Sequence, residues 1–134
     1  MSHGTVSKDM IHGIGMDLVE VDRIEDSIRR FGDRFLGRIL RPEEIQYCQT
    51  QGRPALHVAA RFAAKEAASK AFGTGIGADL GWLDLEVVRH PSGKPALVLH
   101  DSGLELARRV GVVSVHLSLT HTVTTAGATV ILEG

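Results

Sequence analysis

The 134-residue sequence has a single cysteine, almost no net charge and no long apolar segment, and each of these shortages narrows what the protein can be. Cys48 has no partner for an internal disulfide, so we expect a small, half-buried apolar residue without a chemical role. A net charge of -1 does not favour a protein that coats nucleic acid or an anionic membrane. No apolar run approaches the ~20 residues of a membrane span, so we expect a cytoplasmic protein without membrane contact.

Apolar residues make up 43% of the chain, which is an ordinary share for a protein with a packed core. The first nine residues are small and polar and lack the apolar centre of a signal peptide. We interpret residues 1–9 as an upstream leader or cloning scar. The rest, residues 10–134, is expected to form one domain.

The first half of the chain begins with a strand pattern and continues with a helical one. The alternating apolar stretch from Met10 contains Gly13 and Gly15, which suits a strand that another backbone approaches closely. Asp22 and Glu25 have the spacing of a capping box at a helix start. Apolar residues then recur every three or four positions, which predicts a helix with one apolar stripe. The stripe consists of Ile24, Ile28, Phe31 and Phe35.

Two more helices are predicted before the middle of the chain ends. Gly32 is expected to bend the first helix, and Pro42 fits the first turn of the second. A third helix is predicted from about Pro54 to Phe72. It is rich in alanine, whose small side chain lets a neighbouring element approach the helix backbone closely. These alanines are Ala63, Ala64, Ala67, Ala68 and Ala71.

The second half of the chain is dominated by strand patterns. Two alternating segments separated by turn residues predict a hairpin, and a short helix follows between Asp101 or Ser102 and Gly111. Two further strands complete the chain. The four predicted strands are residues 82–90, 94–100, 112–119 and 124–133. Helices that come early and strands that come late favour an α+β fold with a mainly antiparallel sheet over a doubly wound fold.

Three places in the sequence offer chemistry, and each also has a plain structural explanation. Asp17 is expected to follow the first strand, beside a helix start, where an Asp is commonly a turn or capping residue. Lys70 follows Glu66 by four residues, a spacing typical of an exposed ion pair on a helix. The alanines around Glu66 instead indicate a packed face, where an acid needs a compensating cation or hydrogen bonds. His121 lies in a threonine-rich turn, where a hydrogen-bonded loop residue is the ordinary role.

The glycine-rich segment after the alanine helix has two explanations as well. Gly73 and Gly75 suit a helix C-cap and a flexible turn. They follow a helix instead of opening one, so they lack the strand-to-helix context of a nucleotide loop. A backbone that contacts a nearby phosphate is the alternative.

Four segments together resemble one known family. GIGMDLVEVDRI, RFAAKEAASKAFGTG, SGKP and SLTH come in the order and at the distances found in the holo-acyl-carrier-protein synthase type of 4'-phosphopantetheinyl transferase, from about Ile11 to Glu133. The resemblance implies transfer of the phosphopantetheine arm of coenzyme A to a serine of an apo acyl carrier protein, with Mg²⁺ as cofactor and release of adenosine 3',5'-bisphosphate. It also implies a homotrimer with active sites at subunit interfaces.

The resemblance assigns roles residue by residue. Asp17 and Glu66 become the Mg²⁺-binding acids, and this fits an ion that is often held by one or two carboxylates with phosphates and water. Lys70 joins them as a catalytic cation that reaches the same phosphates. The other matched positions would contact coenzyme A: Arg61, Gly73, Gly75, Ser92, Gly93, Lys94, Pro95 and His121. Thr120 and Met16 depart mildly from the family pattern. The base is open between Glu66 and a metal-bound water.

Arginines recur at helical spacing on the first helix and form what we name the docking stripe. Its members are Arg23, Ser27, Arg30, Arg34 and Arg38, and the pattern places Glu25, Asp26 and Asp33 away from it. A solvated helix face is one explanation. Because the family's carrier proteins are acidic and dock on this helix, the resemblance instead implies carrier binding by Arg23, Arg30 and Arg34.

Two other hypotheses stay open for the chain. One is a different metal-dependent enzyme that acts on a nucleotide pyrophosphate without a protein acceptor. The other is a non-enzymatic binder of coenzyme A or a carrier protein, in which Asp17 and Glu66 only cap and pair. The transferase is favoured because one substrate set explains the acids, the lysine, the glycines and the arginines together.

Overall fold

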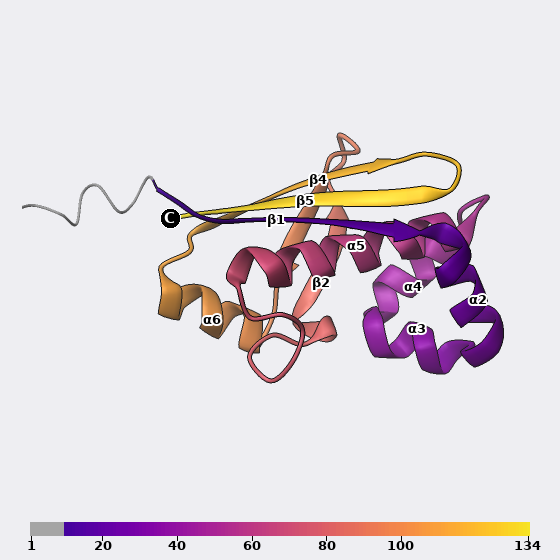
Figure 1. The fold of residues 1–134 in the computed structure, drawn as a ribbon, viewed down its shortest axis with the longest axis horizontal. Coiled ribbons are helices and arrows are strands. Elements are labelled where there is room, and N and C mark those ends of the chain that lie inside the picture. The colour runs from indigo at the N-terminus through magenta and orange to yellow at the C-terminus, as the bar shows by residue number, and fades with distance from the viewer. Residues whose placement is uncertain (1–9) are drawn as a thin grey trace, which may run out of the picture.

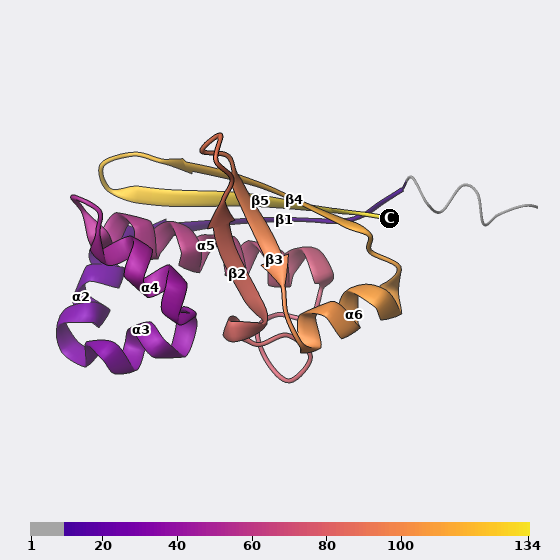
Figure 2. The same cartoon turned by 180° about the vertical axis from the view of Figure 1, so that it is seen from behind.

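The computed structural model describes residues 10–134, and the predicted leader, residues 1–9, lies outside them. Three antiparallel strands form the main sheet in the order β1 (Ile11–Glu20), β5 (Thr125–Glu133), β4 (Ser114–His121). Helix α5 (Pro54–Phe72) lies along one face of this sheet (Figure 1). The hairpin of β2 (Leu85–Arg89) and β3 (Pro95–Leu99) crosses beside α5 and β4 (Figure 2). The predicted α+β fold with a mainly antiparallel sheet is confirmed.

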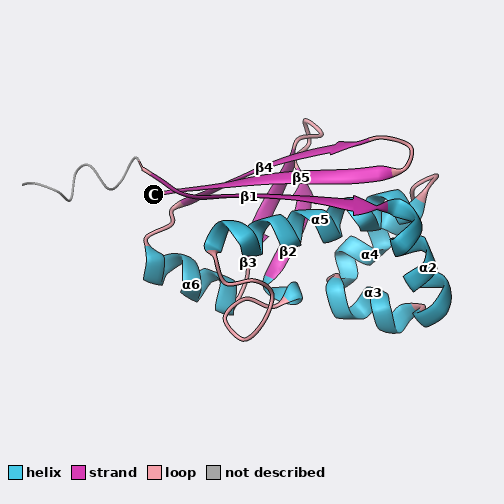
Figure 3. Cartoon of the chain, viewed as in Figure 1, coloured by secondary structure: helices cyan, strands magenta, loops and turns pink. Residues whose placement is uncertain are grey.

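The remaining helices gather at the two ends of α5 (Figure 3). Helices α2 (Val21–Phe31), α3 (Asp33–Ile39) and α4 (Pro42–Gln49) lie at one end, and η1 (Trp82–Asp84) and α6 (Ser102–Val110) lie toward the other. Gly32 has a φ of 55° and separates α2 from α3, so the predicted bend is a break. No helix among residues 10–134 is long and apolar enough to cross a membrane, and the cytoplasmic location stays a prediction.

Three local predictions are wrong. Asp17 lies within β1, which continues to Glu20, instead of at a strand end. Helix α2 starts at Val21 without a side-chain cap, so Asp22 and Glu25 do not form the expected capping box. Its first amide is satisfied from far away in the sequence, because Val21 N donates to Thr124 O at 2.9 Å. Residues 82–84 form the short helix η1 instead of opening a strand. Cys48 is buried more completely than expected, at 1% exposure, and burial raises the pKa of its thiol.

The contact between β1 and α5 explains both the glycines and the alanines. A Cβ atom added to Gly13 would lie 2.0 Å from Ala71 O, and one added to Gly15 would lie 1.9 Å from Ala67 O. Only hydrogen atoms fit at these two positions, and only small helix residues allow the approach. The predicted close backbone packing is therefore confirmed, and it brings Asp17 against the same helix.

The opposite side of β1 is apolar and uncovered. Ile14, Met16 and Leu18 point away from α5 and are 60%, 61% and 71% exposed. Alternate residues of a strand point to opposite faces of a sheet, so these three share a face that Asp17 and Gly15 do not. We name Ile14, Met16 and Leu18 the outer face.

Candidate functional site

Asp17, Glu66 and Lys70 gather where β1 passes α5, and we name them the acid–lysine site. Lys70 Nζ lies 2.9 Å from Asp17 Oδ1 and 3.1 Å from the carbonyl oxygen of Met16. Lys70 therefore reaches across to β1 and pairs with Asp17. The alternative in which it pairs with Glu66 along the helix is not what the structure shows. The lysine is half exposed and the Asp17 side chain is 16% exposed, so the site opens to solvent on one side.

The two acids of this site influence each other. Partial burial raises the pKa of Glu66, the negative charge of Asp17 raises it further, and Lys70 opposes both effects. Among residues 10–134, no group of three or more His, Cys, Asp or Glu side chains could hold a metal. A divalent cation here would be bound by two carboxylates and would take its other oxygen ligands from water or substrate. That donor set suits Mg²⁺, which keeps several waters and binds phosphates.

The glycine segment after α5 caps the helix. Gly73 has a φ of 79°, and the amides of Gly73, Thr74 and Gly75 all donate to Ser69 O, at 3.0, 3.2 and 3.3 Å. The C-cap explanation is confirmed. No atom lies within 4 Å of where a Cβ would stand on Gly73 or Gly75, so the backbone is also accessible from outside.

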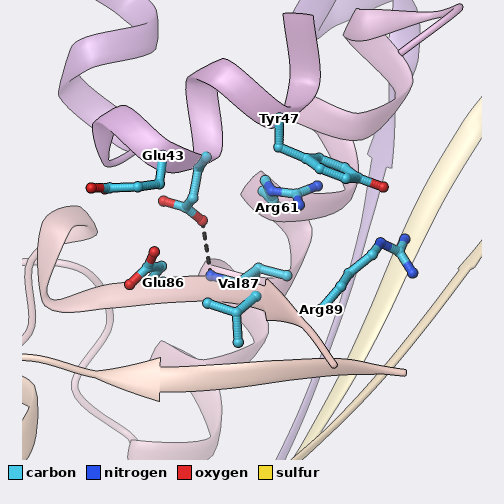
Figure 4. A pocket seen from close by; sticks show the side chains of 8 residues that line it. Glu43, Tyr47, Arg61, Glu86, Val87 and Arg89 are labelled. Atoms are coloured by element: carbon cyan, nitrogen blue, oxygen red, sulfur yellow. Dashed lines mark hydrogen bonds between the residues drawn. The ribbon is translucent and has the colours of Figure 1, made fainter. Parts of the chain in front are cut away.

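Arg61 lies in a different place, beneath a pocket of about 350 Å³ between α4, α5 and β2 (Figure 4). Its side chain is 2% exposed and its Nε atom has no hydrogen-bond partner. The Tyr47 ring lies 4.6 Å from the Arg61 guanidinium and 5.8 Å from that of Arg89. We name the hollow lined by Tyr47, Arg61 and Arg89 the arginine pocket. At this end of the pocket the buried, unpaired N–H donor and the two cations favour an anion, whereas the other end is lined by the carboxylates of Glu43, Glu44 and Glu86 (Figure 4).

Positive charge extends from the arginine pocket toward the turn between β4 and β5. Burial lowers the pKa of His57, and the charges of Arg61, Arg89 and His121 lower it further. His121 is the last residue of β4, which extends two residues past the predicted strand end, and it lines a hollow of about 430 Å³ together with Arg53 and Val123. Arg53 donates to the carbonyl of Val123 and so attaches this turn to the start of α5.

The predicted site residues thus fall into separate groups. Arg61 and Glu66 are five residues apart on α5, so their side chains point about 140° apart around the helix. Neither the arginine pocket nor the hollow at His121 is lined by Asp17 or Glu66. Residues 92–94 lie in the tip of the β2–β3 hairpin, where Gly93 has a φ of 90°, and Pro95 begins β3 opposite Arg89. A single chain does not gather all the predicted residues around one cleft.

The docking stripe is exposed but is not one continuous row. The break at Gly32 divides it between α2 and α3, and a hollow of about 400 Å³ lies at the corner. Asp26 lies 3.6 Å from Arg30, so the prediction that this acid lies away from the stripe is wrong; residues four apart on a helix are neighbours. Arg23 and Arg34 form no ion pair within the described residues. The hollow is lined by Ser27, Phe31, Arg34, Phe35 and Arg38.

Sequence reasoning missed the residues that build the arginine pocket around Arg61. Tyr47 on α4 and Arg89 on β2 come from two other elements, and nothing in their local sequence marks them as neighbours of Arg61. It also missed Lys65, which is completely buried against Glu44. The available signal for Lys65 was its position among the alanines of a helix in which most residues are buried.

Comparison with known proteins decides the family. The sequence profile of the 4'-phosphopantetheinyl transferase superfamily matches residues 13–126. The chain belongs to this superfamily. A holo-[acyl-carrier-protein] synthase of Koribacter versatilis is 53% identical over 124 residues, which cover 92% of this chain and 99% of the relative. The prediction of a phosphopantetheinyl transferase of this type is confirmed.

Solved structures of the superfamily have the same fold. The holo-[acyl-carrier-protein] synthase of Neisseria meningitidis superposes with a TM-score of 0.88 at 37% identity, covering 93% of this chain and all (100%) of that chain. The synthase of Bacillus anthracis in complex with CoA (3',5'-ADP) superposes with a TM-score of 0.78 at 41% identity, covering 93% of this chain and 98% of that chain.

Proposed function

We propose that residues 10–134 form one transferase domain that moves 4'-phosphopantetheine from coenzyme A to a serine of an apo acyl carrier protein and releases adenosine 3',5'-bisphosphate. The observation that carries this proposal is the acid–lysine site, where Asp17 and Glu66 lie close enough for the charge of one to raise the pKa of the other. Two acids and one lysine fit a magnesium pyrophosphate, since both charge signs are met.

Within this site each residue has a role. Asp17 and Glu66 would hold Mg²⁺, which when bound offsets the charge of the pyrophosphate and stabilises the leaving bisphosphate. Lys70 places a cation 2.9 Å from Asp17. There it would offset the negative charge of the phosphate whose bond to the leaving group breaks. The accessible backbone at Gly73 and Gly75 lets the phosphates approach the end of α5. The group that accepts the serine proton is left unassigned.

The arginine pocket and the residues near it would bind the nucleotide half of coenzyme A. Arg61 offers a buried N–H group without a partner, and His121 lies on the same positively charged side. Residues 92–95, at the hairpin tip and the start of β3, would contact the adenosine; they are Ser92, Gly93, Lys94 and Pro95. An anionic group bound at the end of the pocket near Arg61 and Arg89, away from Glu43 and Glu86, would satisfy Arg61 and neutralise these two cations.

A complete site then needs a second copy of the chain. Asp17 and Arg61 act on the same coenzyme A but lie on different sides of one protomer, so a neighbouring copy would supply the nucleotide residues. The outer face supports this assembly, because it is apolar and exposed directly beside Asp17. We infer a homotrimer with interface active sites.

Intact-mass analysis of an apo acyl carrier protein incubated with this protein and coenzyme A tests the proposal. With Mg²⁺ we expect the carrier to gain one phosphopantetheine group, and with excess EDTA we expect no gain. Loss of coenzyme A without any carrier would instead support a pyrophosphate hydrolase. Binding of coenzyme A without modification of several carriers would support a non-enzymatic module.

Charge reversal on the docking stripe should separate carrier binding from coenzyme binding. We propose that Arg23, Arg30 and Arg34 bind an acidic carrier protein. Arg34→Glu is expected to raise KM for the carrier by about tenfold, with coenzyme A affinity unchanged. Arg30→Glu should have a smaller effect, because Asp26 already pairs with Arg30 at 3.6 Å. Arg108→Glu on α6 is the control, and equal loss of carrier and coenzyme affinity in Arg34→Glu would contradict docking here.

A further inference from the structure

A completely buried ion pair lies at the wall of the arginine pocket and has no part in the proposed chemistry. Lys65 Nζ is 2.7 Å from Glu44 Oε1, and both side chains are fully excluded from solvent. Burial lowers the pKa of Lys65, and the charge of Glu44 opposes this shift. Two apolar side chains of similar volume would fill the space without removing charges from water. Stability alone therefore does not explain why these two residues are charged.

The polar contacts of this pair join several elements at one point. Lys65 on α5 also donates to the carbonyl of Ile39 at the end of α3, at 2.7 Å. Glu44 Oε1 accepts a second bond from the backbone N–H of Arg41, at 2.9 Å. Its other oxygen, Oε2, accepts from the backbone N–H of Val87 on β2 at 2.9 Å, the dashed line of Figure 4. One carboxylate thus fixes α4, α5 and the free edge of β2 to one another.

The joined residues are those next to the walls of the arginine pocket. Arg61 lies four residues before Lys65 on α5, so the two share a helix face. Tyr47 lies three residues after Glu44 on α4 and shares a helix face with it. Arg89 lies two residues after Val87, on the same face of β2. Glu44 and Val87 themselves line the pocket. The contacts of Glu44 therefore determine how far apart the three walls stand.

We propose that Lys65 and Glu44 are positioning residues that set the geometry of the arginine pocket for the nucleotide of coenzyme A. This inference rests on the proposed function for the identity of the ligand. The pair acts through Tyr47, Arg61 and Arg89 and does not bind the ligand itself. Binding groups lose affinity when the residues that support them leave them free to move by about 1 Å.

Two double variants test the proposal without leaving a buried unpaired charge. Lys65→Met with Glu44→Leu removes the hydrogen bond between the Val87 amide and residue 44 completely. Lys65→Met with Glu44→Gln replaces one of the two carboxylate oxygens by an NH₂ group. Arg41 and Val87 donate to different oxygens, so the remaining carbonyl oxygen keeps only one of these two contacts. Glu105→Gln on the exposed side of α6 is the control for loss of a carboxylate. Coenzyme A affinity is measured by calorimetry, and the Val87 amide is followed by hydrogen exchange.

A positioning role predicts a graded result. The Leu-containing variant should bind coenzyme A about tenfold more weakly, the Gln-containing variant should be intermediate, and Glu105→Gln should match the wild type. The Val87 amide should exchange faster in the same order, while the Val130 amide in the main sheet stays protected. A folded variant with wild-type coenzyme A affinity, or with unchanged Val87 exchange, would overturn the inference. A lower Tm with unchanged affinity would show a purely stabilising pair.

If the proposed function is wrong, these experiments give a different result from the one expected if only the positioning role is wrong. In the first case the wild-type chain itself would not bind coenzyme A or modify a carrier protein. The Val87 exchange measurement needs no ligand, so it still decides whether Glu44 holds β2 against α4. If only the Leu-containing variant fails to fold, the Gln-containing variant decides the affinity question.

Discussion

Glu66→Gln is expected to lower the rate of phosphopantetheine transfer by about a thousandfold, because the substitution removes one of two proposed Mg²⁺-binding carboxylates while keeping the size of the side chain. Titration of Mg²⁺ into the assay should show a weakened metal dependence. The fold should persist, since an amide in this half-buried position does not carry the charge that burial and Asp17 disfavour. Intact-mass analysis of the carrier protein gives the rate, and thermal unfolding verifies the fold.

Asp17→Asn and Glu105→Gln complete this experiment. Asp17→Asn should cause a similar loss of rate, and it also removes the ionic partner of Lys70. Glu105→Gln removes an exposed carboxylate on α6 and should leave both rate and metal dependence unchanged. If the Glu66→Gln enzyme transfers at the wild-type rate with the same Mg²⁺ requirement, Glu66 does not bind the metal and has only a structural role.

Gly15→Ala should destabilise the protein by about 3 kcal/mol or more, because the new methyl group has no space. Its Cβ would lie 1.9 Å from Ala67 O and 2.7 Å from Ala71 N, and both are backbone atoms that cannot rotate away. Strand β1 would have to move off α5, and Asp17, two residues on, would move with it. We therefore expect a lower midpoint of urea unfolding and a loss of transfer activity together.

Gly37→Ala is the matched control for this substitution. Gly37 lies within helix α3, and no atom lies within 4 Å of the position that the new methyl group would take. Alanine there should stabilise the protein by about 0.5–1 kcal/mol, since it restricts the unfolded chain and favours the helix. A Gly15→Ala protein with a wild-type unfolding midpoint would mean that β1 and α5 are not packed as closely as described.

Local signals account for most of the fold that could be predicted. Pro54 and Gly73 mark the two ends of α5 because a proline fits a first helical turn and a glycine fits a left-handed C-cap. Strand alternation likewise located the hairpin and the last two strands. The start of α2 could not be placed in this way, because its first N–H group is satisfied by Thr124, a residue far along the chain.

Only part of the candidate site could be predicted from the sequence, for the same physical reason. Motifs identified Asp17, Glu66 and Lys70, but the pairing of Lys70 with Asp17 joins β1 to α5 and has no local signature. The buried contact of Lys65 with Glu44 also joins residues distant in sequence. Both cations lie on one alanine-rich helix, yet tertiary packing exposes Lys70 and buries Lys65.

The strand order of the main sheet also determines when the chain can fold during synthesis. Strands β1 and β4 are each joined to the sheet through β5, and Ile11 pairs with Glu133. On the ribosome, β1 therefore emerges long before β5, its hydrogen-bonding partner. Its backbone has no strand to pair with while the helices between them are synthesised. The sheet is thus completed late, by a contact between residues distant in sequence. Until β5 is synthesised, the apolar strand β1 remains exposed in the nascent protein, where chaperones can bind it.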